Sequence, residues 1–357
     1  MYILLAILAF GLLIAVHELG HFISAKLLGV RVIEFAIGMG PKLIKKQGKE
    51  TLYTLRALPI GGFCAMDGQD EVLDDPRAFT SQKRWRRIVI LLSGSLANFI
   101  VAFIIIAALT AGAAGFVGTT ITGFADAFPN QGEDGLMVGD TIISVNGERL
   151  YYAQDFTMFM QLARSGEVDL VVSRDGQRIS LNRFPLERRE FLNDDGQAVM
   201  RFGIDFNVIE GSFIEQMRYS VYQSMNFVRM IRVSIAQIIG GYAGIADISG
   251  VVGIVDAMND IGQQSPSFGA ALGNIAFFTA FIGINLAVMN LLPIPALDGG
   301  RIFFIFISFI IEKVVRKKLD PKYEGYIHTG AMILLFGFMI LIFVNDITRL
   351  VSRLTYA

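Results

Sequence analysis

Two histidines and one glutamate stand within a five-residue stretch of the apolar N-terminal segment. His17 and His21 are four positions apart, and Glu18 directly follows the first histidine. On a helix, residues four apart lie on one face with their Cβ atoms about 5–6 Å apart, so both imidazoles can bind one cation. Glu18 can then reach a water molecule at that cation without itself being a ligand. The spacing is the H-E-x-x-H pattern of zinc metallopeptidases.

A third ligand must come from elsewhere in the chain, because catalytic zinc sites usually take three protein ligands and leave one position for water. Asp298 is the best candidate, since it closes an apolar segment in which an unpaired carboxylate is costly. The remaining histidine and the single cysteine fall in predicted loops. We therefore expect His17, His21 and Asp298 to hold one Zn²⁺, with Glu18 as the general base.

The composition indicates a membrane protein. Hydrophobic residues make up 53% of the 357-residue chain and charged residues only 18%, whereas soluble domains are about 25% charged. The formal net charge of −1 gives no reason to expect a nucleic-acid partner. With one cysteine, the chain can form no internal disulfide.

Four segments have the length and apolar character of lipid-spanning helices, which need about 20 mostly apolar residues. They are residues 2–28, 88–115, 272–292 and 330–348. The first lacks the basic start and the small-residue cleavage site of a signal peptide, so we expect it to be retained. The predicted fold class is a polytopic α-helical membrane protein with four transmembrane helices.

Basic residues set the expected orientation, since cytoplasmic loops carry an excess of Lys and Arg. The connection between the first and second spans is rich in these residues, and so is the one between the third and fourth. We therefore expect both connections, and the nearby active site, at the cytosolic side. Residues 116–270 would then lie outside.

The first cytosolic connection contains two predicted strands. Residues 30–37 and 51–55 have β-strand character, and turn signals rich in glycine and proline follow each of them. Non-helical backbone is tolerated at membrane depth only where protein or a wet cavity surrounds it. We expect the 30–63 region to form a membrane-dipping β element beside the active site.

Residues 117–207 have the mixed pattern of an α+β domain. The pattern G-L-x-x-G-D-x-I-x-x-V-N-G at residues 135–147 resembles a PDZ domain. Such domains bind a peptide as an added strand at a sheet edge, although the same fold can also serve as a spacer with a blocked groove. Residues 211–270 are amphipathic and form a connector that lies either along the membrane surface or against the spans. The sequence thus predicts two membrane domains, residues 1–115 and 271–357, flanking these parts.

Two non-proteolytic functions fit parts of the pattern. Short motifs match by chance, and His and Glu inside a membrane also form ion pathways, so a metal transporter is one alternative. A transporter would need more polar residues along its spans than the two serines, one asparagine and one threonine of the second span. A PDZ scaffold is the other alternative, and it would have no use for Glu18.

The chain resembles the site-2 protease family of intramembrane zinc metalloproteases (peptidase family M50), in its bacterial RseP/RasP-type branch with one PDZ domain. The segments that carry the resemblance are His17–His21, Leu58–Phe63, Gly94–Asn98, the PDZ block and Asn290–Gly299.

The resemblance implies the same zinc ligands and the same base as the residue pattern, and it adds substrate-positioning roles for Asn290, Pro293 and Pro295. The implied function is a zinc metalloendopeptidase that cleaves transmembrane segments in a bacterial cytoplasmic membrane. The implied substrates are single-span membrane proteins, such as anti-sigma factors, or signal-peptide remnants.

Overall fold

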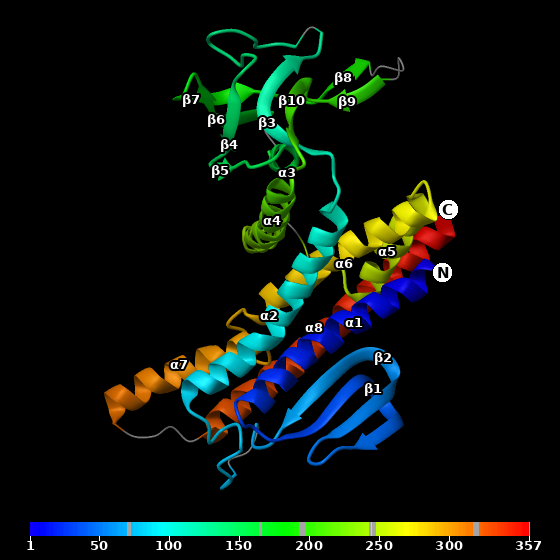
Figure 1. Ribbon diagram of the computed structural model, residues 1–357, viewed down its shortest axis with the longest axis vertical. Coiled ribbons are helices and arrows are strands. Elements are labelled where there is room, and N and C mark those ends of the chain that lie inside the picture. The colour runs from blue at the N-terminus through cyan, green and yellow to red at the C-terminus, as the bar shows by residue number, and fades with distance from the viewer. Residues whose placement is uncertain are drawn as a thin grey trace. The chain divides into compact units, whose positions relative to one another are not determined.

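The computed structural model describes residues 1–69, 73–126, 128–163, 166–192, 198–242, 244, 248–316 and 321–356. The chain divides into two compact units. We call Met1–Leu109 together with Phe227–Ala357 the helical unit, and Thr110–Asn226 the sheet unit. Figure 1 follows the chain through its helices and strands.

Among the described residues, four helices are long and apolar enough to cross a membrane, as the sequence predicts. They are α1 (Tyr2–Leu27), α2 (Arg84–Thr110), α6 (Phe268–Asn290) and Gly325–Ser352 within α8 (Pro321–Tyr356).

The prediction for the second span is wrong at its C-terminal end. The sequence predicts a span that reaches residue 115, but α2 stops at Thr110. Gly112 has a φ of +79°, which ends the helix, and strand β3 begins at Gly115. An apolar run does not by itself separate a helix from an apolar strand that follows it.

The first connection folds as two long antiparallel strands, β1 (Val32–Gln47) and β2 (Leu52–Met66), beside α1 (Figure 1). The strands predicted at residues 30–37 and 51–55 mark where these two begin. Both strands continue well beyond the predicted ends, because the glycine-containing turn signals are bends within strands.

Each of these strands bends back, so the pair behaves as four short strands. In order across the sheet they are residues 62–66, 32–37, 52–56 and 42–47. The bends include Gly38 and Gly61, whose φ values of +86° and +91° suit glycine because it has no Cβ. Residues 62–66 therefore form an edge of this sheet.

Helices α1 and α2 approach each other closely. A Cβ added to Gly20 would lie 2.3 Å from the carbonyl oxygen of Ser93, so the two backbones are nearly in contact at this position. The Ser93 hydroxyl also donates a hydrogen bond of 2.9 Å to the Gly20 carbonyl. A buried apolar cluster continues from there to the sheet and to α7. Its members are Ala25, Val30, Val32, Phe35, Cys64, Met66, Phe79, Ile90, Leu91 and Ile305.

A non-helical connection separates α6 from α7 (Asp298–Val315). Pro293 and Pro295 lie in this connection, and a proline lacks the N–H that would continue a helix. Ala296 has a φ of +80°, an uncommon conformation for a residue with a Cβ. Helix α7 is not predicted from the sequence, because four of its 18 residues are charged and the segment does not read as an apolar span.

Two further helices precede α6 in the chain, and the first of them crosses the boundary between the two units at Phe227. The helical periodicity of residues 213–239 corresponds to α4 (Phe213–Ile239), and α5 (Val251–Gln264) follows it. Asp346 of α8 accepts hydrogen bonds from the N–H groups of Gly250 and Gly253, at 3.1 and 2.9 Å. A carboxylate is favoured at a helix N-terminus, where N–H groups lack partners within the helix. This contact ties α8 to the start of α5.

The sheet unit contains a six-stranded sheet with the order β10-β3-β4-β6-β7, and β5 pairs with β4. One helix, α3 (Ala153–Leu162), lies between β5 and β6 in the chain. The strands are β3 (Gly115–Phe124), β4 (Thr141–Val145), β5 (Glu148–Arg149), β6 (Glu167–Arg174), β7 (Gln177–Pro185) and β10 (Ile204–Glu210), with a separate pair β8 (Arg189–Leu192) and β9 (Ala198–Arg201). Asn146 and Gly147, both with positive φ, form the tight β4–β5 turn that an Asn-Gly pair predicts.

A charged cluster on the β1–β2 sheet makes its stability depend on pH. Burial alone would raise the pKa of the Glu34 carboxyl, but hydrogen bonds from Arg56, Thr54 and Lys42 lower it from 4.5 to about 2. Because the folded-state pKa is the lower one, the stabilisation is complete above pH 4.5 and is lost as the pH falls toward 2.

We predict that hydrogen-exchange protection of residues 42–56 falls in the wild type between pH 4.5 and 3, once intrinsic exchange rates are corrected for. Glu34→Gln should lower this protection already at pH 7 and remove the further fall in acid. The exposed Glu133→Gln in the sheet unit is the control and should behave as the wild type. Equal protection in Glu34→Gln and wild type at pH 7 would contradict the assignment.

Candidate metal centre

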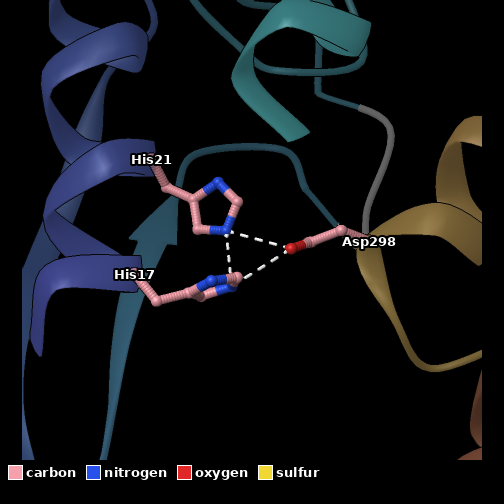
Figure 2. A group of neighbouring side chains, drawn as sticks. All are labelled: His17, His21 and Asp298. Carbon is pink, nitrogen blue, oxygen red and sulfur yellow. Dashed lines mark hydrogen bonds and ion pairs between the residues drawn. The ribbon is translucent and has the colours of Figure 1, made fainter. Parts of the chain in front are cut away.

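Three side chains from two helices meet at one point. Nε2 of His17 and Nε2 of His21 each lie 3.2 Å from Oδ2 of Asp298, and the two nitrogens lie 3.2 Å from each other. Figure 2 shows both imidazoles projecting from α1 toward the carboxylate at the start of α7. His21 is buried, and only 12% of the His17 side chain and 18% of the Asp298 side chain are exposed. The structure thus brings together the three residues that the sequence predicts as ligands.

The hydrogen bonding of His21 indicates that a cation or a proton lies among the two imidazole nitrogens and the carboxylate oxygen. Its Nδ1 lies 2.8 Å from the backbone carbonyl oxygen of Ile90, which can only accept, so Nδ1 carries the hydrogen. In the neutral imidazole, Nε2 then presents a lone pair toward His17 and the Asp298 carboxylate. Lone pairs that converge in this way repel one another unless a cation or a proton lies among them.

The donor set suits zinc. Two imidazole nitrogens and one carboxylate oxygen are ligands that Zn²⁺ takes in catalytic sites, with one position left open. The potential ligand atoms of His17, His21 and Asp298 all lie within 4.8 Å of one another. The Ile90 carbonyl supplies the outer hydrogen bond that typically fixes the tautomer and orientation of a metal-binding histidine.

A second group of contacts holds the Ile90 carbonyl in position. The Ser93 hydroxyl lies 2.6 Å from the Ile90 carbonyl oxygen and 2.7 Å from the hydroxyl of Ser24 on α1. Because the same carbonyl oxygen accepts from His21, these hydroxyls link the orientation of the imidazole to the packing of α1 against α2.

Because Gly94 has no side chain, the two imidazoles can occupy the space beside it. A Cβ added at this position would lie 2.4 Å from Nε2 of His21 and 2.8 Å from Cε1 of His17. Any residue other than glycine would therefore displace the imidazoles. The resemblance singled out this glycine, but only the structure shows what it accommodates.

Asp298 is held by a tightly folded connection. It occupies the first turn of α7, where the helix dipole favours a carboxylate. Each of the next two glycines also touches the preceding loop. A Cβ on Gly299 would lie 2.3 Å from the carbonyl of Leu291, and one on Gly300 would lie 2.2 Å from the carbonyl oxygen of Ile294.

Glu18 lies between the two histidines in sequence and faces the sheet. Its carboxylate is hydrogen-bonded to the backbone of Cys64 in β2. A Cβ on Gly62 would lie 3.4 Å from its Cγ, so glycine brings the edge of the sheet within contact of this side chain. The predicted base is thus held between the predicted metal ligands and a strand edge.

A cavity of about 500 Å³ opens beside these groups. It is lined by residues of α1, β2, α2, α6 and α7 and of the α6–α7 connection. The lining residues are Ile14, His17, Glu18, His21, Phe63, Cys64, Ala65, Met66, Gln69, Leu91, Asn98, Leu286, Asn290, Ala296, Leu297, Asp298 and Arg301. The site is therefore reached through a space large enough for a short extended peptide.

The predicted substrate-positioning residues fall into two groups. Asn290, the last residue of α6, lines the cavity with the three predicted ligands. Pro293 and Pro295 lie in the connection before Asp298 and are not among the residues that line the cavity. The structure therefore brings the asparagine, but neither proline, to the cavity wall.

Arg301 and Asn98 are among the cavity residues that received no site role from the sequence. Arg301 follows Asp298 by three positions on α7, and Asn98 follows Gly94 by four on α2. Helical spacing from a predicted ligand would have indicated the arginine if α7 had been anticipated. In the sequence, Asn98 is one of the few polar residues of its span and ends the Gly94–Asn98 segment of the family resemblance, but neither observation assigned it a role.

Comparison with known proteins identifies the family. The family model described as peptidase family M50 matches residues 5–338. The chain belongs to peptidase family M50. A provisionally named zinc metalloprotease of Clostridium perfringens is 35% identical to it, over 97% of this chain and 98% of that protein. The regulator of sigma-W protease RasP of Bacillus subtilis and the zinc metalloprotease RasP of Bacillus licheniformis are each 27% identical over 96% of this chain, and over 97% and 98% of their own lengths.

This M50 protease is therefore a zinc-dependent metalloendopeptidase, as the sequence predicts. The four helices of spanning length in the described part of the chain make it a membrane protein, and intramembrane proteolysis fits both observations. The transporter and scaffold alternatives have no support from the family.

We predict that Gly94→Ala lowers zinc affinity by at least about tenfold, the range typical for groups that orient metal ligands. Helix α2 lies so close to the imidazoles that an added methyl group has no room, so it must displace both of them. Zinc content and competition with a chelator would measure the loss.

Gly273→Ala is the matched control, because a Cβ there meets no atom within 4 Å although the residue also lies on a spanning helix. It should bind zinc as the wild type does. Wild-type zinc affinity in Gly94→Ala would show that the imidazoles do not occupy the metal-binding position in this arrangement.

Proposed function

We propose that His17, His21 and Asp298 hold the catalytic zinc ion and that Glu18 is the general base. The observation that carries the proposal is the convergence of three ligand atoms at the wall of a cavity that Glu18 also lines. Neither the ion pathway of a transporter nor the peptide groove of a scaffold requires this combination.

When bound, zinc supplies a Lewis acid that polarises a carbonyl oxygen and lowers the pKa of water to about 7. Glu18 follows His17 directly and so stands beside the ligands without joining them. Its carboxylate takes a proton from the attacking water and delivers it to the leaving amide nitrogen. The hydrogen bond to the Cys64 backbone holds the carboxylate in place for both transfers.

The proposed substrate is a membrane-spanning segment that unwinds over a few residues. An intact helix uses its carbonyls in i→i−4 hydrogen bonds, and unpaired backbone groups in lipid each cost several kcal/mol. Residues 62–66 form a sheet edge, and Phe63–Met66 line the cavity. An unwound segment can pair with this edge as an added strand, which is why we propose that the β1–β2 sheet dips into the membrane.

We propose different roles for the three residues that the family resemblance singled out. Asn290 can hydrogen-bond an extended segment because its side chain lines the cavity. Pro293 and Pro295 act on the protein itself, since they stiffen the connection that delivers Asp298 to the histidines.

The proposed location is a bacterial cytoplasmic membrane, with the metal centre near the cytosolic side. The basic connections between the first and second spans and between the third and fourth support this orientation. The sheet unit would then lie outside. One relative is named a regulator of sigma-W protease, so membrane-held regulators such as anti-sigma factors are the first substrate class that we propose, and signal-peptide remnants are the second.

We propose that the sheet unit is a PDZ-like filter for substrates. Strand β10 stands at an edge of its sheet, where a peptide could add as a further strand. Phe206 of β10 contacts Phe156 of α3, with ring centroids 5.4 Å apart, so helix and edge strand form adjoining walls. The unit can select substrates either by binding a newly exposed chain end or by excluding proteins with large outer domains.

We predict that Glu18→Gln retains zinc but loses hydrolysis of a transmembrane peptide by about a thousandfold or more, because Glu18 is the one carboxylate among the described cavity residues that is not a predicted ligand. A chelator should abolish wild-type cleavage, and added zinc should restore it. Zinc content and single-turnover cleavage in liposomes are the measurements.

The control Glu133→Gln changes an exposed carboxylate of the sheet unit and should keep full activity. His17→Ala should lose both zinc and activity, which separates the ligand role from the base role. Cleavage by Glu18→Gln at the wild-type rate would show that the base is a different group.

We predict that removing residues 117–207 changes the choice between a full-length substrate and one already trimmed at its outer domain. If the unit excludes bulky substrates, the shortened protein cleaves both; if the unit docks them, it cleaves neither. Cleavage rates for both substrates, with zinc content as a test of intact folding, decide between these modes. An unchanged preference would mean that the sheet unit is not a filter.

A further inference from the structure

One buried side chain in the cavity wall has polar atoms that the described structure leaves without partners. Asn98 is 0% exposed, and neither its Oδ1 nor its Nδ2 has a hydrogen-bond partner among the described residues. Buried side-chain amides are nearly always paired, and leaving one unpaired is costly. The same side chain lines the cavity beside the metal centre. A buried amide in that position requires a partner that enters the cavity.

The position of Asn98 on α2 relates it to the metal centre. Gly94 touches both imidazoles, and Asn98 lies four residues further along, on the same face of the helix. Asn98 therefore stands one helical turn from the metal ligands along the cavity wall. Asn290 of α6 also lines the cavity, so amide side chains from two different helices adjoin the space that an extended substrate would enter.

The chemistry of the side chain identifies the kind of partner. An amide presents both a donor and an acceptor, and one residue of an extended peptide offers an N–H and a C=O. A substrate segment that unwinds in lipid releases these groups and needs partners for them. A purely apolar wall could hold side chains of the substrate but could not satisfy its backbone.

We propose that Asn98 binds the backbone of the unwound substrate next to the scissile bond, donating from Nδ2 to a carbonyl and accepting at Oδ1 from an N–H. This role rests on the proposed proteolytic function and adds a substrate-binding residue from α2 to it. The sheet edge at residues 62–66 pairs with one side of the extended segment, and Asn98 supplies partners for groups that the edge does not reach.

The test is Asn98→Leu, which keeps the approximate size of the side chain and removes both polar atoms. We expect KM for a transmembrane peptide in liposomes to rise about tenfold, the effect of losing a buried hydrogen bond, with kcat within about twofold. Zinc content and melting temperature should not fall, because the described structure shows no protein partner that the leucine would deprive.

A substrate series gives the decisive readout. Replacing single backbone amides near the scissile bond by esters removes one N–H at a time. We expect one ester position to slow cleavage by wild type and to cause no further loss in Asn98→Leu, as a double-mutant cycle requires for a direct contact.

Ser95→Ala is the matched control. Ser95 is also buried on α2 with an unpartnered hydroxyl, but it is not among the residues that line the cavity. It should leave KM and the ester series unchanged.

If Asn98→Leu keeps the wild-type KM and ester pattern, or only unfolds more easily, the inference fails. Chelator-sensitive cleavage by the wild type would then still uphold the proposed function. Absence of that cleavage in the wild type would overturn the proposed function itself.

Discussion

The rest of the helical unit depends on one electrostatic constraint, the meeting of two imidazole nitrogens and a carboxylate oxygen 3.2 Å apart. Three acceptors at such distances are stable only around a cation or a shared proton. Neighbouring contacts fix the positions of the three side chains. The Ile90 carbonyl orients one ring, the missing side chain of Gly94 leaves room for both, and the broken connection after α6 delivers Asp298 from the opposite side. A preorganised site of this kind avoids reorganisation during the reaction.

The second constraint is the low polarity of the membrane. Helices satisfy their own backbone, so most of the helical unit can be apolar without penalty. The β1–β2 sheet is the exception, and it lies beside α1 (Figure 1) with residues 62–66 as an edge at the cavity. Unpaired strand edges are a liability in most proteins. In the proposed function this edge becomes useful, because an unwound substrate would bring its own unpaired backbone groups into the same space. The hydrogen bond that the Glu18 carboxylate accepts from the Cys64 backbone joins this edge to the predicted base.

Much of this arrangement could be read from the residues. Four apolar runs gave the spans, and a spacing of four gave the face shared by His17 and His21. Both depend only on local periodicity, which a helix preserves wherever it packs. The predictions failed where local pattern was insufficient. The length of β1 and β2 was missed because glycine can mark a bend as well as an end, and α7 was missed because its charges conceal an otherwise apolar helix.

By itself, the sequence determined a membrane setting and predicted the types of the ligands and the base beside them, because each follows from side-chain chemistry and from spacing along one helix. Only the tertiary structure decided that Asp298 reaches the histidines across nearly the whole length of the chain. It also decided that Glu18 meets a strand edge and that Asn98 lines the cavity with polar atoms that have no partner among the described residues. These relations depend on how separate helices and strands approach one another, and that approach is set by packing at glycines such as Gly20 and Gly94, which no local periodicity encodes.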